Sequence, residues 1–248
     1  MQPFPRIAAL LVGLLPGFAA AGDTEWLLAP YGWLPTVSVD QTFDDGSGGG
    51  GGSSGAEVLS KLDFAAMLRA EVARGRWGAM LDYIYVSLAD QTTFSPLPAI
   101  SIDIDGDLDL EVLELGAFYR VSGEARGIDL MLGVRRIDVD LGLVLTRQDQ
   151  PPRPLDVSAD VDDLFLGARY TYPFGKRWDF SLRGDYGFGD SDGTVNLLAG
   201  IGVQFNDTFG MKFGYRHADI ELEVEVEGAP ETMEIVLSGP YVGLLFRF

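Results

Sequence analysis

The sequence predicts an all-β protein, an antiparallel up-and-down transmembrane β-barrel of about ten strands, with eight or twelve strands as the alternatives. Three observations predict this fold. Segments with alternating apolar and polar residues recur along the chain, short and long separators alternate between them, and their number is even. Alternation is the period of a strand with one apolar and one polar face. Short turns at one end and longer loops at the other are typical of barrels that cross a bacterial outer membrane.

The first residues predict export. The chain begins MQPFPRIAALLVGLLPGFAAAGD, where one basic residue precedes a short apolar run and a group of alanines. This pattern predicts a signal peptide over residues 1–21, cleaved after Ala21. The apolar run from Ile7 to Leu15 is well short of the roughly 20 residues that a spanning helix needs. We therefore expect the mature chain, residues 22–248, to form a single outer-membrane barrel domain.

The composition excludes several classes of function. The chain has no cysteine, so it has no disulfide framework and no thiol chemistry. A formal net charge of −19 and a pI near 4.2 argue against a nucleic-acid partner. We expect no cofactor, no dedicated metal site and a monomer.

The alternating segments cover ten ranges, and an even number of strands puts both termini on one side. The expected strands are 26–39, 62–73, 77–88, 102–121, 128–145, 155–172, 178–189, 194–205, 209–226 and 231–248. Between them, the range 89–100 is expected to be a long loop. The glycine-rich run 46–55 lacks the Lys and the following helix of a phosphate-binding loop, so it is expected to be a flexible extracellular tip.

The alternation also separates a lipid-facing side from a luminal side. In the segment 178–189 apolar and polar residues alternate, so they lie on opposite faces of the strand. The apolar residues are Trp178, Phe180, Leu182, Tyr186 and Phe188, and the polar residues are Asp179, Ser181, Arg183 and Asp185. Aromatic residues beside the short turns suit a girdle at the membrane interface, and they are Trp77, Tyr119, Tyr172 and Trp178.

The carboxy-terminal residues resemble a known sequence signal. The chain ends GPYVGLLFRF, which puts Val242, Leu244, Phe246 and Phe248 on one parity and resembles the assembly signal of outer-membrane barrels. With GARYTYPFGKRW and GVQFNDTFGMKFGYRH, the chain resembles the small bacterial outer-membrane β-barrel proteins of the outer-membrane protein W and porin-like group. The resemblance covers the mature chain. It implies an outer-membrane location, contacts with outer-membrane lipids and lipopolysaccharide, and assembly by the barrel-assembly machinery.

The stretch IDIDGDLDLEVLELGAFYR, residues 102–120, alternates acids with aliphatic residues. A calcium loop of the EF-hand type needs a Gly at its sixth position, whereas Gly106 is at the fourth position when Asp103 is counted as the first. The period is that of a strand, but the apolar parity changes between Val112 and Leu113. The same change occurs in four further segments: 128–145, 155–172, 209–226 and 231–248.

Two explanations of the parity change are open. A bulge in each strand would keep the apolar face on lipid. Alternatively, the strands are continuous: the half of each strand next to a short turn already supplies the 9 to 11 residues that span a membrane, and the rest projects on the extracellular side. We favour continuous strands, because five coincident bulges are a demanding requirement. The projecting half would then have an apolar interior and an acidic outer wall.

Inward positions in the embedded half collect charges of both signs. We expect them to pair, since an unpaired buried charge is very costly. This predicted lumen network comprises Arg69, Glu71, Asp82, Glu114, Arg120, Asp129, Arg135, Arg169, Asp179, Arg183, Asp185, Lys212, Arg216 and Arg247. A barrel of ten strands is only slightly wider than the eight-stranded kind that its own side chains fill. The network is therefore expected to plug the lumen, with a constricted ion path as the alternative.

Two further groups of residues are candidate sites. His217 is the only histidine and shares its parity with Asp219, but no Ser motif accompanies it, so no catalytic residue is expected. The acidic wall could hold divalent cations against lipopolysaccharide phosphates, and it could also be merely solvated. Its members are Asp103, Asp105, Asp107, Asp109, Glu111, Asp138, Asp140, Asp160, Asp162, Glu221, Glu223 and Glu225.

The function that the sequence favours is that of a non-enzymatic barrel, structural or binding a small apolar ligand in its extracellular half. A narrow diffusion channel of the porin kind is the alternative, and a surface hydrolase is the weaker one.

Overall fold

The structure, a computed structural model, describes residues 24–42, 48–53, 62–97, 100–122, 126–147, 153–226 and 229–248. The predicted signal peptide lies outside these ranges. Within them, no helix is long and apolar enough to cross a membrane. The described strands are β1 (Thr24–Trp33), β2 (Thr36–Thr42), β3 (Gly48–Ser53), β4 (Leu62–Arg74), β5 (Trp77–Leu97), β6 (Ile100–Arg120), β7 (Gly127–Arg147), β8 (Arg153–Phe174), β9 (Trp178–Gly189), β10 (Gly193–Gln204), β11 (Phe209–Val226) and β12 (Ala229–Arg247).

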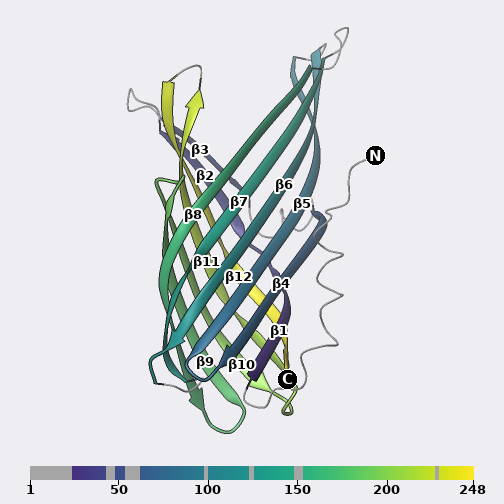
Figure 1. The fold of residues 1–248 in the computed structure, drawn as a ribbon. Helices are drawn as coiled ribbons and strands as arrows, with labels where there is room; N and C mark the ends of the chain where they lie inside the picture. Colours follow the sequence, from purple (N-terminus) through teal and green to yellow (C-terminus); the bar gives the residue numbers. More distant parts are fainter. Residues whose placement is uncertain are drawn as a thin grey trace.

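Ten of these strands form a closed antiparallel barrel, as predicted (Figure 1). The strands from β4 to β12 each pair with the next in chain order, and β1 closes the ring between β4 and β12. Both ends of the barrel domain, at Thr24 and Phe248, lie at the end that carries the short turns, here the short-turn end. Closure is completed there by two backbone hydrogen bonds, in which Trp26 N–H donates to Phe248 O at 3.0 Å and Phe248 N–H to Trp26 O at 3.1 Å.

The first predicted strand, 26–39, is divided in two by the sequence around Pro35. β1 ends at Trp33 and β2 begins at Thr36, and both continue along β12. Proline has no N–H to donate and therefore interrupts a strand ladder. Beyond this break, β2 no longer follows β4 and instead pairs with β3.

Two loop predictions are wrong. Within the glycine-rich run, Gly48–Ser53 forms β3, paired with β2 from Thr42↔Gly48 to Val37↔Ser53. A strand ladder uses only main-chain groups, so it can hold glycines that contribute no side chain. The range 89–100 is also mostly strand, because β5 continues to Leu97 and β6 begins at Ile100.

The register answers the question of the parity change. The β6–β7 pairing runs unbroken from Ile102↔Arg147 to Arg120↔Asp129, and β7–β8 runs unbroken from Gly127↔Thr171 to Leu145↔Arg153. In the described pairings, register shifts occur only near Phe64 in β4–β5 and between Phe94 and Leu97 in β5–β6. The strands are therefore continuous where the apolar parity changes, and the bulge explanation is wrong.

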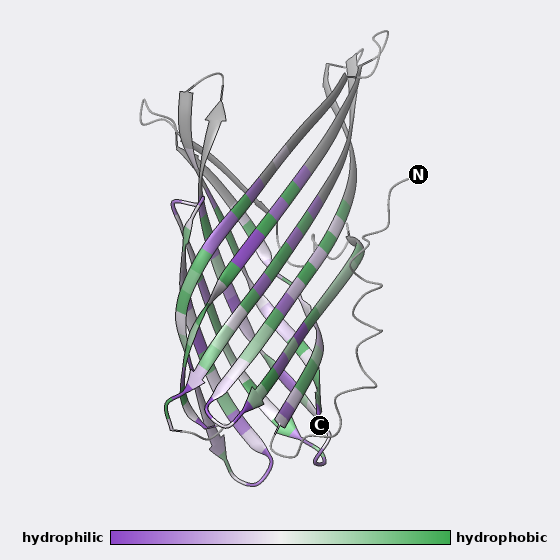
Figure 2. Ribbon diagram, viewed as in Figure 1, coloured by the Kyte–Doolittle hydropathy of each residue, from purple (hydrophilic) through white to green (hydrophobic). Residues whose placement is uncertain are grey.

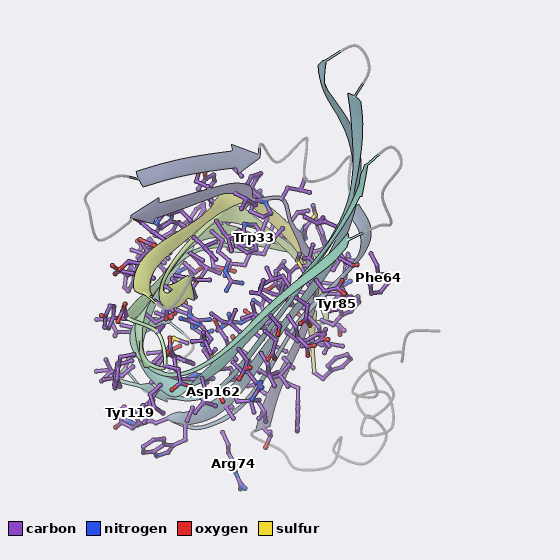
Figure 3. The ribbon with its side chains drawn as sticks, turned by 90° about the horizontal axis from the view of Figure 1, so that it is seen from above. Trp33, Phe64, Arg74, Tyr85, Tyr119 and Asp162 are labelled. Atoms are coloured by element: carbon purple, nitrogen blue, oxygen red, sulfur yellow. The ribbon has the colours of Figure 1, made fainter. Side chains whose placement is uncertain are left out.

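Each continuous strand keeps one face on the lumen along the part whose side chains the structure describes. In β6, Leu115 faces outward and is 45% exposed, whereas Glu114 faces inward and is buried. Further along the same strand, Asp109 is on the outer face and Leu110 packs on the interior. Figure 2 shows the alternation along the strands, and in the axial view of Figure 3 Trp33 lies inside while Phe64 and Tyr119 lie outside.

The outer face carries an apolar band over the half of the barrel nearest the short turns. Its exposed members include Leu115, Leu130, Leu132, Val134, Leu164, Leu166, Tyr170, Leu182, Tyr186, Leu197, Phe213, Tyr215, Val242 and Leu244. Strands β5 to β8 have 21 or 22 residues each, about twice the 9 to 11 that span a membrane. The other half of these strands projects beyond the band.

The projecting half divides into two sheets. On one side, β4 follows β1 only as far as Leu68↔Pro30. On the other, β9 follows β8 only as far as Gly189↔Asp163. Among the described residues, one sheet then contains β4 to β8, and the other contains β11, β12, β2 and β3, and the two separate toward the far end (Figure 1).

The inward position of Leu110 can be tested against its outward neighbour. Replacing Leu110 with Asp buries a carboxylate among aliphatic side chains, so we expect it to lower the free energy of unfolding by about 2–4 kcal/mol. Asp109→Asn on the opposite face should change it by under about 0.5 kcal/mol. Denaturant unfolding measures both, and single cysteines at 109 and 110 probed with an impermeant thiol reagent give an independent reading. Equal labelling of the two positions would contradict continuous strands.

Candidate functional site

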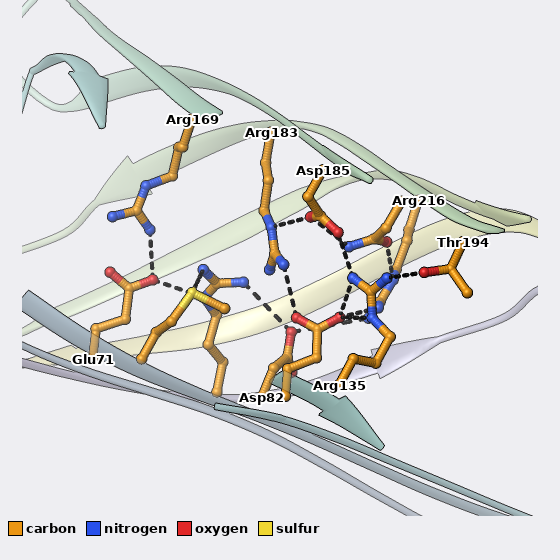
Figure 4. A network of polar contacts seen from close by, with 12 residues as sticks. Glu71, Asp82, Arg135, Arg169, Arg183, Asp185, Thr194 and Arg216 are labelled. Carbon is orange, nitrogen blue, oxygen red and sulfur yellow. Dashed lines mark hydrogen bonds and ion pairs between the residues drawn. The ribbon is translucent and has the colours of Figure 1, made fainter. Parts of the chain in front are cut away.

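A network of ion pairs crosses the lumen at the level of the outer apolar band (Figure 4). Its centre is Glu114 of β6, whose side chain is 1% exposed. Three guanidinium groups surround this carboxylate: Arg135 at 2.9 Å, Arg183 at 2.8 Å and Arg216 at 3.5 Å. These arginines come from β7, β9 and β11, so one carboxylate links four strands on opposite sides of the barrel.

Asp185 of β9 is the second shared carboxylate. It accepts hydrogen bonds from Arg183 Nε at 2.7 Å and from Asn196 Nδ2 at 3.1 Å, and it also forms an ion pair with Arg135. Arg135 in turn donates to Thr194 Oγ1 at 2.9 Å. Charge-assisted bonds of this kind are among the stronger ones in proteins, and here they are buried.

A second group of pairs lies nearer the short-turn end. Glu71 accepts from Arg69 at 2.7 Å and from Arg169 at 2.6 Å, and Arg169 also contacts Asp129 at 2.8 Å. Arg69 continues to Asp82 at 3.4 Å, which links this group to the first. The lumen is therefore spanned by connected pairs of both signs, with the charges compensating one another.

Two phenylalanine rings complete the filling of the lumen. Phe118 and Phe165 are at most 1% exposed, and guanidinium groups lie over both: Arg169 is 5.0 Å from the Phe118 ring centre and Arg135 is 5.3 Å from that of Phe165. Gly133 makes room, since a Cβ there would lie 2.6 Å from the Phe165 ring. Cation–π contacts add attraction to the burial of these rings.

An apolar layer lies next to the ionic one, on the side away from the short-turn end. The buried members are Trp33, Met67, Ile84, Val112, Ile137, Val161, Ala218, Ile220 and Leu237. Arg216 joins the two layers, because its guanidinium lies 4.9 Å from the Trp33 ring centre. The Trp33 indole N–H donates to the Gly239 carbonyl at 3.2 Å, so its only polar group is satisfied.

The remaining predicted network residues lie closer to the short-turn end. Arg120 pairs with Glu25 at 2.7 Å, and Arg247 approaches Asp179 at 3.9 Å and bonds Gln204. Lys212 forms no ion pair within 4 Å in the described part of the chain.

The predicted assembly residues all lie on β12 or just after it. Val242, Leu244 and Phe248 are exposed on the outer face, at 48%, 41% and 71%, and Phe246 is partly buried against Phe209.

The sequence reasoning missed several polar members of the lumen. Asp163 bonds Ser191 at 2.7 Å and Thr194 at 3.2 Å, and the Tyr31 hydroxyl donates to Asp82 at 2.8 Å. The inward position of Asp163 could have been predicted from the strand period, because Val161 and Asp163 lie on the same face of a continuous strand. Tyr31 had no such signal, because an aromatic residue fits the lipid face equally well.

His217 faces away from this network. It lies on the outer face of β11, where its Nδ1 is 2.6 Å from Ser238 Oγ on β12. In the described residues no carboxylate hydrogen-bonds to the ring. The serine partner was not anticipated, because it is 21 residues away in sequence.

The acidic wall is partly described. Asp109, Glu111, Asp138, Asp140, Asp160, Asp162 and Glu221 are exposed or partly exposed, whereas the side chains of Asp103, Asp105, Asp107, Glu223 and Glu225 lie outside the described set. Arg136 contacts Asp138 at 3.1 Å and Asp162 at 3.2 Å. The Tyr85 hydroxyl donates to Asp109 at 3.3 Å, and burial together with the Asp109 carboxylate raises the pKa of this phenol. Within the described residues no cluster of acids fits a metal ion.

Glu114 offers a direct test of the network. Glu114→Gln keeps the size of the side chain but leaves three buried guanidinium groups short of their shared anion, so we expect the free energy of unfolding to fall by about 3–5 kcal/mol. Asp138→Asn is the matched control, because its pair with Arg136 is exposed and should contribute under about 1 kcal/mol. Denaturant unfolding of the refolded protein gives both values. A loss for Glu114→Gln no larger than the control's would show that the network does not hold the lumen together.

Comparisons with known proteins bear on the fold. No protein-family model matches the chain, and no curated protein sequence does. The kinship with the outer-membrane protein W group therefore stays a prediction. Among solved structures, the outer-membrane protease OmpT from Escherichia coli matches with a TM-score of 0.55 and 10% identity, over 91% of this chain and 97% of that one. The translocator domain of the autotransporter NalP from Neisseria meningitidis matches with a TM-score of 0.47 and 11% identity, over 98% and 95%. At 10% identity the OmpT match is informative about the fold alone, and that fold is a bacterial outer-membrane β-barrel.

Proposed function

We propose that this protein is a non-enzymatic outer-membrane β-barrel that is closed to ions at membrane level and binds a small apolar molecule in its projecting half. The observation that carries the proposal is the stacking of two filled layers across the lumen, one ionic around Glu114 and one apolar around Trp33. An ion crossing the barrel would have to break connected buried pairs and then enter an aliphatic layer, and both steps are costly.

The outer surface supports the membrane location. The apolar band leaves many large side chains exposed, which water would disfavour and lipid would not. Aromatic residues gather beside the short turns, where Trp77 packs on Tyr119 at 4.9 Å and Phe174 on Trp178 at 6.3 Å. On this proposal outer-membrane lipids cover the band and lipopolysaccharide surrounds the acidic wall. The barrel-assembly machinery would recognise the β12 end.

A non-enzymatic role is supported by the direction of His217. Its ring lies on the outer face, away from the interior of the projecting half. The likeness to a protease concerns the fold alone, because the identity is 10%.

Conductance separates the closed barrel from a narrow diffusion channel. The protein in planar lipid bilayers is expected to show almost no steady single-channel current, because the ionic and apolar layers fill the lumen. The double variant Phe118→Ala/Phe165→Ala removes the two luminal rings and should raise the current, which provides the control that insertion is detectable. A steady large conductance of the unaltered protein would rule out the plug.

The apolar ligand is expected above the Trp33 layer. Val37, Leu110, Val139 and Ile235 are partly buried apolar side chains that pack on this layer, on its far side from the ionic network. They offer an apolar surface between the two projecting sheets.

Trp33 makes ligand binding measurable. A small apolar fluorophore such as N-phenyl-1-naphthylamine should bind saturably and receive excitation energy from this buried indole. We expect Trp33→Phe to remove most of the transfer, while Trp178→Phe, on the outer face and 43% exposed, should remove little beyond the membrane background. Transfer that never saturates, or that depends equally on both residues, would mean that the fluorophore only partitions into lipid.

A further inference from the structure

The lumen contains a cavity that its closure does not explain. Its volume is about 110 Å³, room for roughly three or four water molecules at about 30 Å³ each, and it lies between the ionic network and the short-turn end. The charged groups that line it are six basic and three acidic: Arg69, Arg169, Arg183, Lys212, Arg216 and Arg247, with Glu71, Asp82 and Asp179.

The three lining carboxylates are already engaged. Glu71 is shared by two arginines at 2.7 and 2.6 Å. Asp82 accepts from the Tyr31 hydroxyl at 2.8 Å and lies 3.4 Å from Arg69. Asp179 lies 3.9 Å from Arg247. Carboxylates behind the wall compensate the other arginines, so what sets the cavity apart is its unused donors and not a net charge.

Three donors lie around Gly200: the Lys212 ammonium, the Ser181 hydroxyl and the Tyr241 hydroxyl. Within the described part of the chain, none of them forms a hydrogen bond or an ion pair within 4 Å. Ser181 faces Gly200 across the β9–β10 ladder. A Cβ on Gly200 would overlap the Tyr241 hydroxyl and lie 3.1 Å from Lys212 Cε. The absence of a side chain at Gly200 thus lets the tyrosine and the lysine meet beside the serine.

Arg183 lines the same cavity but is not a fourth donor. Its Nε and Nη2 donate to Asp185 and Glu114, and its Nη1 is buried away from the open space of the cavity. Lysine and arginine can only donate, and the two hydroxyls can donate as well. The Lys212 ammonium is attracted by Asp179 and Glu71 but forms no ion pair within 4 Å among the described residues, so a group that accepts from all three donors would be favoured.

We propose that this cavity binds a small inorganic oxyanion of the phosphate or sulfate class. Lys212 Nζ, Tyr241 OH and Ser181 Oγ would each donate to a separate oxygen. A tetrahedral oxyanion has enough acceptor oxygens for three donors arriving from different strands, and charge-assisted bonds to it are the stronger kind.

The cavity opens toward the short-turn end, which is the periplasmic side on the proposed function. At that end Arg247 and Asp179 have side chains that are 42% and 21% exposed. Toward the other end the cavity stops at the ionic network, so the anion binds without crossing the barrel. This site therefore neither requires nor creates conduction.

Calorimetric titration of the full mature chain in a non-ionic detergent tests the site, with inorganic phosphate, sulfate and chloride as separate ligands. We expect saturable binding of phosphate and sulfate. Lys212→Met should weaken it at least about tenfold, and Tyr241→Phe and Ser181→Ala about three- to tenfold each, because each removes one donor to an ion. Lys176→Met, an exposed lysine in the β8–β9 turn, is the matched control and should leave binding unchanged.

The variants separate a binding effect from misfolding. Lys212→Met removes an unpaired luminal charge and Tyr241→Phe removes one oxygen, so both should keep the heat-modifiable migration of a folded barrel. The proposal is overturned if the unaltered protein binds neither oxyanion, if Lys212→Met binds as tightly, or if Lys176→Met loses as much. Chloride binding as tight as that of phosphate would overturn the oxyanion assignment. None of these outcomes bears on bilayer conductance, so the closed-barrel proposal stands or fails separately.

Discussion

The architecture depends on one constraint, the two-residue side-chain period of strands whose register does not shift where the apolar parity changes. Because the β6–β7 and β7–β8 registers run without a shift, the described residues of one parity face the lumen on both sides of that change. A change of apolar parity at Val112 and Leu113 therefore cannot be a change of direction. At this height the outer face turns from apolar to acidic and the inner face from charged to aliphatic, which on the proposed membrane location marks the change from lipid to water outside the wall.

The inward charges below that height are stable only as a connected set. Glu114 is surrounded by three arginines from three other strands, and Asp185 is bonded by Arg183, Arg135 and Asn196. Each guanidinium reaches across the lumen because its strand is fixed in register. Phe118 and Phe165 occupy the space that paired polar groups leave, opposite glycines that have no Cβ. Ion pairs, buried phenylalanine rings and glycines beside those rings thus together fill the narrow lumen.

Much of the fold could be predicted from the sequence, because alternation, turn spacing and strand number are local patterns. The inward parity of Glu114 and Arg135 was readable for the same reason. Contacts between distant strands could not be predicted from the sequence, because the tilt and closure of the barrel decide which arginine reaches which carboxylate. β3 was missed because a run of glycines has no side-chain period to read, although its backbone pairs with β2. The Ser238 partner of His217 was missed because it lies on another strand.

The interior of the barrel is filled by charged side chains in one half and by aliphatic side chains in the other. The wall differs in the same way, because it is a closed ring in the first half and two separate sheets in the second. On the proposed membrane location, lipid covers the outside of the closed half. Every backbone group there must then be paired within the sheet, so the ring has to be closed and its fixed width is filled by long, paired side chains. Beyond the apolar band water can satisfy free backbone groups. The break at Pro35 and the early end of β9 at Gly189 then let the wall part into two sheets. In the divided part, aliphatic residues of the two sheets, such as Ile137 and Leu237, lie in one buried cluster. The closed part is thus filled by paired charges and the divided part by aliphatic contacts, and the proposed apolar ligand would bind beside those contacts.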